Sequence, residues 1–425
     1  MLKMMRLSEI AGSKPGRWHD WLSAGLLLML FVFSWKSVGM TRFNGLDTPL
    51  FLALSLFCLW RLARSRLVIA TPLLTAYLMW AAWVVFSDFY STRFVAAFAR
   101  DSHWLLLPLF ALLCAGLLRE VPSIIPLLRL TAAASLTTIA LHLVLAAPGV
   151  NNWILEPVFG HVRHLSLAAG ALVIWLYDDE QLGKASRVVL SLGRLAGLAV
   201  LFWAGGRGVL LALAVAILVH SALFAPARKR AILYAFEALI AALVSELASA
   251  GPSSMGLVNS VTRSITADTA DGLSSARITL WGDTVRRLGD GMALWFGWGG
   301  NGFMRMGLAR GFIFHPHNVV LQIMSDWGVI GLVLFANFLR VMIRPLAGLN
   351  LRTSHAALAI SILVYLLITG MIDGGLYHLQ FLICVGLAFA ILRSQQGETD
   401  TQLLTLAISP VLMVLVMVVV HLRTL

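Results

Sequence analysis

Long apolar stretches recur along almost the whole chain, and they limit its possible folds more than any other feature. Thirteen of them come close to the length of about 20 residues that a helix needs to cross a bilayer. They lie near residues 20–38, 47–63, 68–87, 103–118, 124–146, 164–178, 188–204, 208–225, 231–250, 318–340, 355–372, 376–393 and 403–422. They lack the alternating ten-residue pattern of a transmembrane barrel, so they predict helices.

Charged residues are scarce enough to exclude most other classes of protein. They make up 12% of the chain, whereas average soluble proteins carry about 25%. This composition excludes an ordinary soluble enzyme, a disordered protein and a coiled coil. We therefore expect an all-α fold, a polytopic integral membrane bundle of 12 or 13 transmembrane helices.

The basic residues predict the topology of this bundle. The net charge is +12, but the lysines and arginines stand in short clusters between the apolar stretches. Such clusters are typical of topology determinants and argue against a nucleic-acid partner. With the N-terminus inside, most of them fall on the cytoplasmic side. Cys58, Cys114 and Cys384 lie within apolar stretches at no metal-ligand spacing, so we expect small buried side chains.

One long connection divides the chain into three parts. Residues 1–250 hold the N-terminal spans, residues 251–317 form a loop on the outer face, and residues 318–425 hold the C-terminal spans. Loops of this length are usually functional or disordered. The remaining connections are short, as is typical of a helical bundle.

The long loop carries helical signals of its own. Apolar residues recur at helical spacing between about 275 and 289, and Ser274 or Ser275 is placed to cap this amphipathic helix. The glycine-rich turn Gly297–Gly302 follows, and a second short helix is expected over 302–310. The backbone amides of the turn offer a candidate cradle for a phosphate.

Two histidines stand at the outer mouth of the bundle, in the run His315-Pro-His317-Asn318. An imidazole there suits general-base chemistry, because its ordinary pKa is near neutrality. Pro316 disfavours helix for His315, and Asn318 is placed to cap the next helix and leave its amides for an anion. The alternative is a pair of interfacial histidines with no chemical role.

Three arginines are candidates for binding an anion on the same face. Arg207 stands between glycines in a short outer turn, as an exposed fork suited to a phosphate. Arg277 lies in the first turn of the predicted loop helix, where the dipole favours a bound anion. Arg163 lies in the cationic run 160–164 and would extend the site. The alternatives are snorkelling or solvated arginines at helix ends.

Other kinds of chemistry lack their usual motifs. The sequence contains no Walker motif, zinc-type His/Glu helix, cysteine cluster or outer carboxylate pair, so we expect neither a metal nor a cofactor. Asp326, within a predicted span, is expected to pair with an arginine or polar group of the bundle. The remaining outer cluster of arginines and histidines suits a diphosphate that leaves and a hydroxyl that loses its proton.

Together these segments resemble the signature of the O-antigen ligase and polymerase superfamily. In chain order, they are Gly205-Gly-Arg207-Gly208, Ser275-Ala-Arg277, His315-Pro-His317-Asn318, Leu321 and Ser325-Asp-Trp-Gly-Val-Ile-Gly331. The resemblance implies an inverting, metal-independent glycosyltransferase of the GT-C type in the bacterial inner membrane, with its active site facing the periplasm. The donor would be a glycan on undecaprenyl diphosphate. In a ligase the acceptor is lipid A-core, and the product is lipopolysaccharide.

The resemblance also implies roles for individual residues. His317 would orient or deprotonate the acceptor hydroxyl, with His315 as the alternative base. The other implied positions are Arg207, Arg277 and Arg163 for the diphosphate, and Asn318 and Asp326 as structural supports. We expect a monomer among membrane lipids, with no cofactor.

Three other functions stay open at this point. An O-antigen polymerase of the same superfamily would show two outer loops with Arg-x-x-x-Gly motifs, and only Arg287–Gly291 fits. A protein O-glycosyltransferase would carry a sizeable soluble region near the C-terminus, where this chain has short tails. A lipid or sugar exporter would need a polar path through the bundle. The ionisable residues predicted at membrane depth are Arg129, His142, Arg194, His220, Glu237 and Asp326.

Overall fold

The computed structural model describes residues 18–34, 47–64, 68–146, 162–177, 183–247, 256–308, 313–396, 403–405 and 409–422. The N-terminal helices are α1 (Trp18–Ser34), α2 (Asp47–Arg64), α3 (Thr71–Tyr90), α4 (Phe94–Glu120), α5 (Ile124–Ala146), α6 (Val162–Ile174), α7 (Lys184–Ala204), α8 (Arg207–Leu223), α9 (Ala225–Lys229) and α10 (Ala231–Leu247).

The long loop and the C-terminal part continue as helices. The loop contains α11 (Leu257–Ile265), α12 (Ala270–Leu273), α13 (Arg277–Leu288), α14 (Ala293–Phe296) and α15 (Gly302–Arg305). After it come α16 (Val319–Ile343), the 3-10 turn η4 (Arg344–Gly348), α17 (Ser354–Ile372), the 3-10 turn η5 (Gly375–Tyr377), α18 (Leu379–Ser394) and α19 (Ser409–Leu422).

Each of the thirteen predicted apolar stretches contains one of these helices. Within the described residues, six helices are long and apolar enough to cross a membrane, namely α3, α4, α5, α7, α16 and α17. Shorter apolar helices occupy the predicted spans at α1, α2, α6, α8 and α18. The protein is therefore an all-α polytopic membrane protein, as predicted, and the exact number of 12 or 13 spans stays a prediction.

A small β-ladder departs from the predicted all-helical pattern. Strand β1 (Val68–Ala70) pairs antiparallel with β2 (Leu403–Thr405), with Ile69 opposite Leu404. The predicted spans 68–87 and 403–422 therefore begin as strands, because a short apolar run has no periodicity that separates strand from helix. Pro72, in the first turn of α3, fixes where that helix begins.

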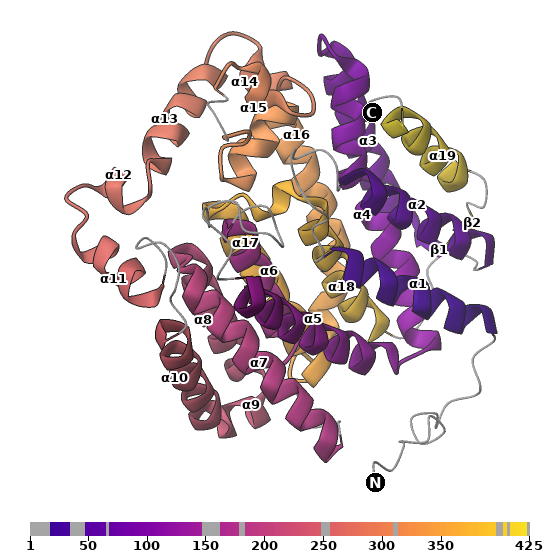
Figure 1. Ribbon diagram of the computed structural model, residues 1–425. Coiled ribbons are helices and arrows are strands. Elements are labelled where there is room, and N and C mark those ends of the chain that lie inside the picture. The colour runs from indigo at the N-terminus through magenta and orange to yellow at the C-terminus, as the bar shows by residue number, and fades with distance from the viewer. Residues whose placement is uncertain are drawn as a thin grey trace.

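The C-terminal helices pack between the N-terminal ones. Helix α18 lies against α4, α17 against α8, and α16 against α3, while α5 packs on α7. Residues from both parts share one hydrophobic core. In Figure 1 the loop helices α11 to α15 arch over one end of this bundle. The three-part division at 250 and 318 stays a proposal about topology.

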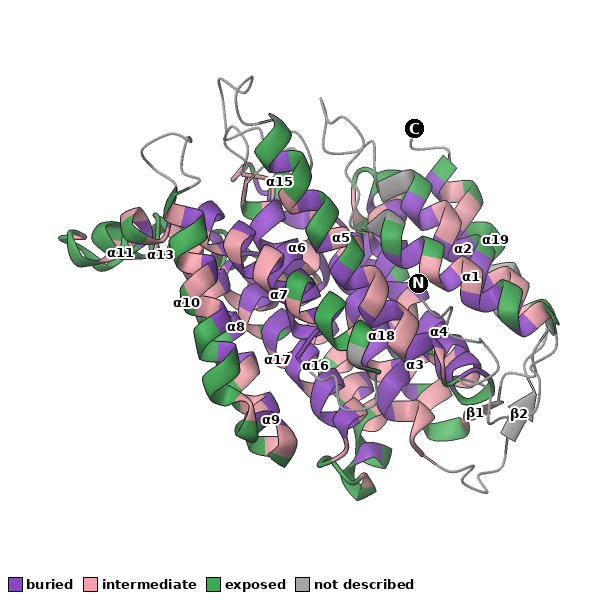
Figure 2. Ribbon diagram, turned by 60° about the horizontal axis from the view of Figure 1, so that its bottom comes forward, coloured by how far each residue is buried: buried purple, intermediate pink, exposed green. Residues whose placement is uncertain are grey.

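Helix α10 shows how the bundle is adapted to lipid. Its large apolar side chains Ile232, Phe236 and Leu239 are exposed, whereas Glu237 and Ser245 are buried. Figure 2 shows exposed residues on α10 at the rim and buried residues concentrated in inner helices such as α4 and α6. A polar inner face and an apolar outer face are the reverse of a soluble amphipathic helix, and they fit a helix that meets lipid.

Helix α13 confirms the predicted amphipathic loop helix, but its N-terminus is built differently. The N-cap position is Ala276, in the left-handed region at φ 63°. The amide of Thr279 donates to Asp271 Oδ1 at 3.0 Å, and the amide of Ile278 donates to Ser274 Oγ at 3.3 Å. A carboxylate and a hydroxyl of the protein therefore already occupy these amides.

The predicted second helix over 302–310 is shorter than expected. Helix α15 ends at Arg305, and Gly307 follows in the left-handed region at φ 71°, which a helix cannot continue through. Residues 309 and 310 lie outside the described residues.

Candidate active site

The His-Pro-His-Asn run is fixed between the start of α16 and the end of α17. Asn318 caps α16, because its Oδ1 accepts from the amides of Val320 and Leu321 at 3.0 and 3.1 Å. Its Nδ2 donates to the carbonyl of Met371 at 3.1 Å, which joins the cap to α17. The prediction that this cap leaves amides for an anion is wrong for these two, since the asparagine itself occupies them.

His317 is held in one tautomer by the backbone. Its Nδ1 lies 3.2 Å from the carbonyl oxygen of Asp373, directly after α17. A carbonyl oxygen only accepts, so Nδ1 carries the proton and Nε2 of the neutral ring carries the lone pair. Burial lowers the pKa of His317 below its ordinary value; Asp373 opposes this with the next largest effects, and Arg277 and Arg163 add smaller reductions. The ring is thus neutral near neutral pH, with an acceptor nitrogen.

His315 is not equivalent to His317. Its Nδ1 accepts from the backbone amide of His317 at 3.2 Å, so Nε2 carries the proton of the neutral ring. The ring is buried and stacks on Tyr377, with centroids 4.6 Å apart. Burial, followed by the neighbouring His317 and His378, holds the pKa of His315 well below its ordinary value. Its Nδ1, the acceptor nitrogen of the ring, is therefore already occupied by the backbone amide of His317.

Arg277 connects the loop to this site through Asp373. Its Nη2 lies 2.5 Å from Asp373 Oδ1, and both side chains are largely buried. The same residue therefore binds Arg277 with its carboxylate and His317 with its carbonyl. Burial lowers the pKa of Arg277, and Asp373 raises it in opposition. On the same helix, Trp281 Nε1 donates to the carbonyl of Pro316 at 2.9 Å, which fixes α13 against the histidine run.

Arg207 reaches from the start of α8 to the loop. Its Nη1 donates to Ser264 Oγ at 3.2 Å and its Nη2 to Ser275 Oγ at 3.0 Å. No ion pair among the described residues includes Arg207. The flanking glycines permit this approach: a Cβ at Gly205, which has φ +62°, would lie 2.5 Å from Ser260 Oγ, and one at Gly208 would crowd α17. The Gly-Gly-Arg-Gly run is therefore a close contact between α8, α11 and α17.

A fourth arginine, Arg263 of α11, joins the three that the sequence singles out. Burial lowers its pKa, and the nearby Arg207 and Arg163 lower it further. Arg163 and Arg207 act on Arg277 in the same way, so Arg207 and Arg163 lie within electrostatic reach of both Arg263 and Arg277. Arg163 is exposed on α6, near His164, whereas Gly160 and His161 of the same run lie outside the described residues.

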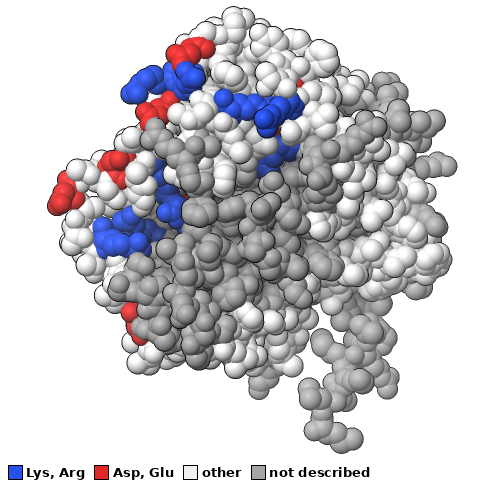
Figure 3. All heavy atoms as spheres, turned by 45° about the horizontal axis from the view of Figure 1, so that its top comes forward, with Lys and Arg blue, Asp and Glu red and all other residues white. Residues whose placement is uncertain are grey.

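Sequence reasoning missed Arg263, although a signal was present. It lies one turn after Ser260 and beside Ser264, on a short helix whose Ser260 hydroxyl donates to the carbonyl of Gly205 at 2.6 Å. A basic residue on a hydroxyl-rich helix face was the available indication. Figure 3 shows the face that carries the loop helices, where Lys and Arg side chains gather in several groups, one of them flanked by Asp or Glu side chains. This local excess of positive charge suits a polyanion.

The glycine-rich turn is not a phosphate cradle. The amide of Gly300 donates to Asp88 Oδ1 at 2.8 Å, and the amide of Gly302 donates to Asp326 Oδ1 at 2.6 Å. The amides of Trp298 and Gly299 donate to carbonyls of α16. All four amides are thus occupied by the protein, which overturns this prediction.

Asp326 has a structural position beside a kink in α16. Its Oδ2 accepts from Gln322 Nε2 at 2.7 Å, so it pairs with polar groups of the protein, as expected. Gly328 takes φ 67° within α16, and this break frees the carbonyls of Ser325 and Asp326 to accept from the glycine turn. A Cβ at Gly328 would lie 2.2 Å from the carbonyl oxygen of Trp295. The Ser-Asp-Trp-Gly run therefore joins the loop to α16.

Residues on which the polymerase and exporter alternatives depend make other contacts in the structure. Arg287, of the single Arg-x-x-x-Gly motif, pairs with Asp290 at 3.0 Å and donates to the carbonyl of Met306 at 3.2 Å. Arg194 forms a buried ion pair with Glu237 at 2.8 Å, between α7 and α10. Among the described residues, no group of three His, Cys, Asp or Glu side chains is arranged to hold a metal ion.

Comparison with known families identifies the central part of the chain. Residues 192–336 match the family model described as O-antigen ligase, which supports membership in the O-antigen ligase superfamily and confirms the resemblance. The matched segment contains Arg207, Arg263, Arg277, His315 and His317, whereas Arg163 and Asp373 lie outside it. No curated protein matches the chain.

Proposed function

With the O-antigen ligase match as the premise, we propose that the protein is an O-antigen ligase of the bacterial inner membrane. It transfers a glycan from undecaprenyl diphosphate to lipid A-core on the periplasmic side, which completes lipopolysaccharide. The observation that carries this proposal is the neutral His317, with its Nε2 lone pair, next to a cluster of four arginines.

The arginine cluster binds the diphosphate of the donor. Arg207 and Arg277 provide guanidinium forks, and Arg263 and Arg163 add positive charge around them. Guanidinium groups match phosphate oxygens in pairs, and they stabilise the charge that grows on the diphosphate as it leaves. Four arginines can do this without a divalent cation, so the proposed reaction is metal-independent.

His317 acts on the acceptor. Its Nε2 takes the proton of the acceptor hydroxyl while the hydroxyl oxygen bonds to the anomeric carbon of the donor sugar. The bond between that carbon and the diphosphate oxygen breaks, and undecaprenyl diphosphate leaves with the electron pair. Attack from the side opposite the diphosphate inverts the anomeric centre. Asp373 keeps the ring in the required tautomer and also holds Arg277, so one residue aligns both halves of the site.

The proposed orientation follows from the two ends of α16. The histidine run precedes its N-terminus, and the basic residues Arg340 and Arg344 lie at its other end. A helix of 25 residues spans about 37 Å at ~1.5 Å per residue, which is sufficient to cross the ~30 Å hydrocarbon core. Because basic clusters favour the cytoplasmic side, the histidines face the periplasm.

The test is transfer by purified protein in detergent, with EDTA present. The donor is a glycan on undecaprenyl diphosphate, lipid A-core is added or omitted, and products are separated by gel mobility. We expect one transfer product that requires lipid A-core. A ladder of longer glycans formed without lipid A-core would identify a polymerase instead. Absence of any glycosyl transfer, with or without added Mg²⁺, would contradict the enzyme proposal and favour export.

A matched pair of variants ties this activity to the site. Arg207→Ala removes a guanidinium from the proposed diphosphate site. Arg286→Ala removes one from α13 whose partner is the surface residue Asp283, at 3.2 Å. We expect loss of transfer in the first variant and wild-type transfer in the second. Equal loss in both would mean that the effect is general charge at the membrane surface.

A further inference from the structure

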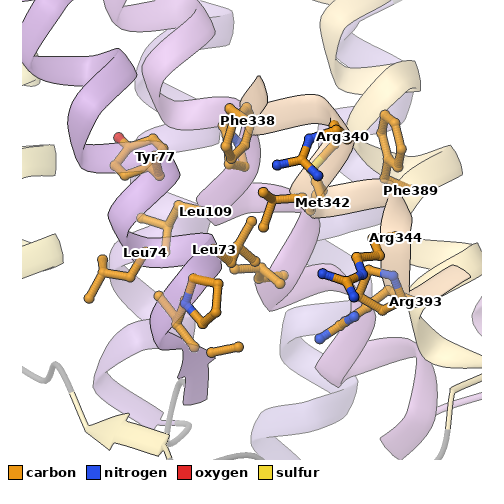
Figure 4. Close-up of a pocket in the computed structure, with 18 of the residues that line it drawn as sticks. Leu73, Leu74, Tyr77, Leu109, Phe338, Arg340, Met342, Arg344, Phe389 and Arg393 are labelled. Atoms are coloured by element: carbon orange, nitrogen blue, oxygen red, sulfur yellow. The ribbon is translucent and has the colours of Figure 1, made fainter. Parts of the chain in front are cut away.

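A cavity lies between the membrane-spanning helices, away from the arginine and histidine cluster. It has a volume of about 590 Å³ and is lined by residues of α3, α4, α16, η4 and α18. Most of its lining is apolar, including Leu73 and Leu74 of α3, Leu109 of α4 and Met342 of α16. Figure 4 shows Leu73, Leu109 and Met342 around the interior of the cavity.

Three arginines line the same cavity. Arg340, Arg344 and Arg393 come from α16, η4 and α18, and Figure 4 places them on one side, opposite the leucines of α3 and α4. None of the ion pairs between described residues includes any of the three. Arg340 donates to Asn337 at 2.9 Å, and Arg393 donates to Gln396 at 2.6 Å, so these partners are neutral.

This arrangement matches an amphiphile with a negative head. An apolar cavity between helices accepts hydrocarbon, and guanidinium groups at its edge bind phosphate oxygens. The three arginines bring positive charge that the described part of the protein does not neutralise with a carboxylate. Arg119 lies at the same edge, where its Nη2 donates to the carbonyl of Arg393 at 2.9 Å, and it adds to this charge.

The position of the cavity separates it from the proposed donor site. Arg340 and His317 lie at opposite ends of α16, so a diphosphate bound at the arginine cluster cannot also contact Arg340, Arg344 or Arg393. By the proposed topology, this edge of the cavity faces the cytoplasmic leaflet. That leaflet supplies phospholipids whose heads are at the right depth.

We propose that this cavity is a binding site for an anionic phospholipid. Its phosphate lies on Arg340, Arg344 and Arg393, and an acyl chain enters the apolar space beside Leu73 and Leu109. Bound in this way, the lipid joins α3 and α4 to α16 and α18. A ligand that binds the folded protein alone stabilises it, so anionic lipid raises the thermal midpoint. The choice of leaflet depends on the proposed membrane orientation. The lipid site itself does not depend on the glycosyltransferase reaction.

The test measures lipid binding to delipidated protein in detergent by native mass spectrometry. Dioleoylphosphatidylglycerol and dioleoylphosphatidylcholine are compared, together with the thermal midpoint in each lipid. We expect dioleoylphosphatidylglycerol to bind roughly tenfold tighter or more, since its head has a net negative charge, whereas the choline cation offsets the phosphate of dioleoylphosphatidylcholine. Equal binding of the two lipids would overturn the proposal.

Variants separate the head site from the cavity. Arg344→Gln combined with Arg393→Gln should abolish the preference for the anionic lipid, and Leu109→Trp, which fills the cavity, should weaken both lipids. The control is Arg352→Gln, an exposed arginine beyond η4 that does not line the cavity, and it should behave as wild type. Retained preference in the double variant would contradict the proposal. The proposal would also be contradicted if undecaprenyl phosphate displaced the phospholipid from wild type and its binding were more sensitive to Leu109→Trp than phospholipid binding. The cavity would then bind the carrier lipid.

Discussion

Replacing His317 by Asn removes the proposed general base and keeps the hydrogen bonds that hold this segment in place. Position 317 has φ 54°, and asparagine is among the few residues that tolerate this region well. The asparagine Nδ2 can donate to the carbonyl of Asp373 as the imidazole Nδ1 does, and the backbone amide still donates to His315. The variant therefore keeps the local hydrogen bonds and loses the basic Nε2.

The expected loss of rate on substitution differs between the two histidines. Loss of a general base lowers the rate about 10²- to 10⁴-fold, which is roughly 2.7–5.5 kcal/mol of barrier. His315→Asn should cost about 0.5–1.5 kcal/mol, or roughly 2- to 13-fold, because His315 supplies one neutral hydrogen bond that orients the run.

The assay is the initial rate of glycan transfer to lipid A-core at saturating donor, with folding checked by the thermal midpoint in detergent. We expect His317→Asn to lower kcat and leave KM for the donor nearly unchanged. The reasoning would be refuted by a folded His317→Asn protein that retains activity within tenfold of wild type, or by a larger loss in His315→Asn.

Three further outcomes follow from the same geometry. Arg263→Ala should lower kcat/KM for the donor about 10- to 100-fold, the effect of losing one charged hydrogen bond, while Arg286→Ala stays near wild type; an unchanged donor KM and kcat would exclude Arg263 from the site. Asp326→Ala leaves two buried donors without an acceptor, at about 1–3 kcal/mol each, so its thermal midpoint in detergent should fall; an unchanged midpoint would contradict the structural role. Arg277→Gln removes a charge that lowers the pKa of His317, so the acid limb of the residual activity should move to higher pH; a shift to lower pH would be the wrong sign.

The length of the apolar stretches was sufficient to predict the helical bundle. Every predicted stretch contains a helix, because about 20 apolar residues have no other stable structure in lipid. It was insufficient for the ends of the helices at β1 and β2, where pairing between residues far apart in sequence decides the structure. The left-handed residue at Ala276 likewise depends on Asp271, whose carboxylate turns back to the first turn of α13.

Candidate residues for the proposed site could be selected from the sequence where a residue type carries the chemistry by itself. The arginines and histidines were identified because their charge and pKa suit the reaction. The sequence alone assigns no role to Asp373, since its contacts in the structure use a backbone carbonyl and a partner 96 positions away. The glycine turn was misinterpreted as a phosphate cradle for a related reason. Its amides suit an anion, and only the folded structure shows that Asp88 and Asp326 provide it.

The most direct test of the central claim is the pH dependence of kcat/KM for transfer, compared between wild type and His317→Asn. Burial lowers the pKa of His317, so the ring stays neutral and active at pH values somewhat below the ordinary pKa of histidine. It is protonated only at still lower pH. The account predicts an acid limb with a midpoint below about 6.5 in wild type, and no such limb in the residual activity of His317→Asn. A midpoint above about 6.5, or the same limb in both proteins, would contradict His317 as the base.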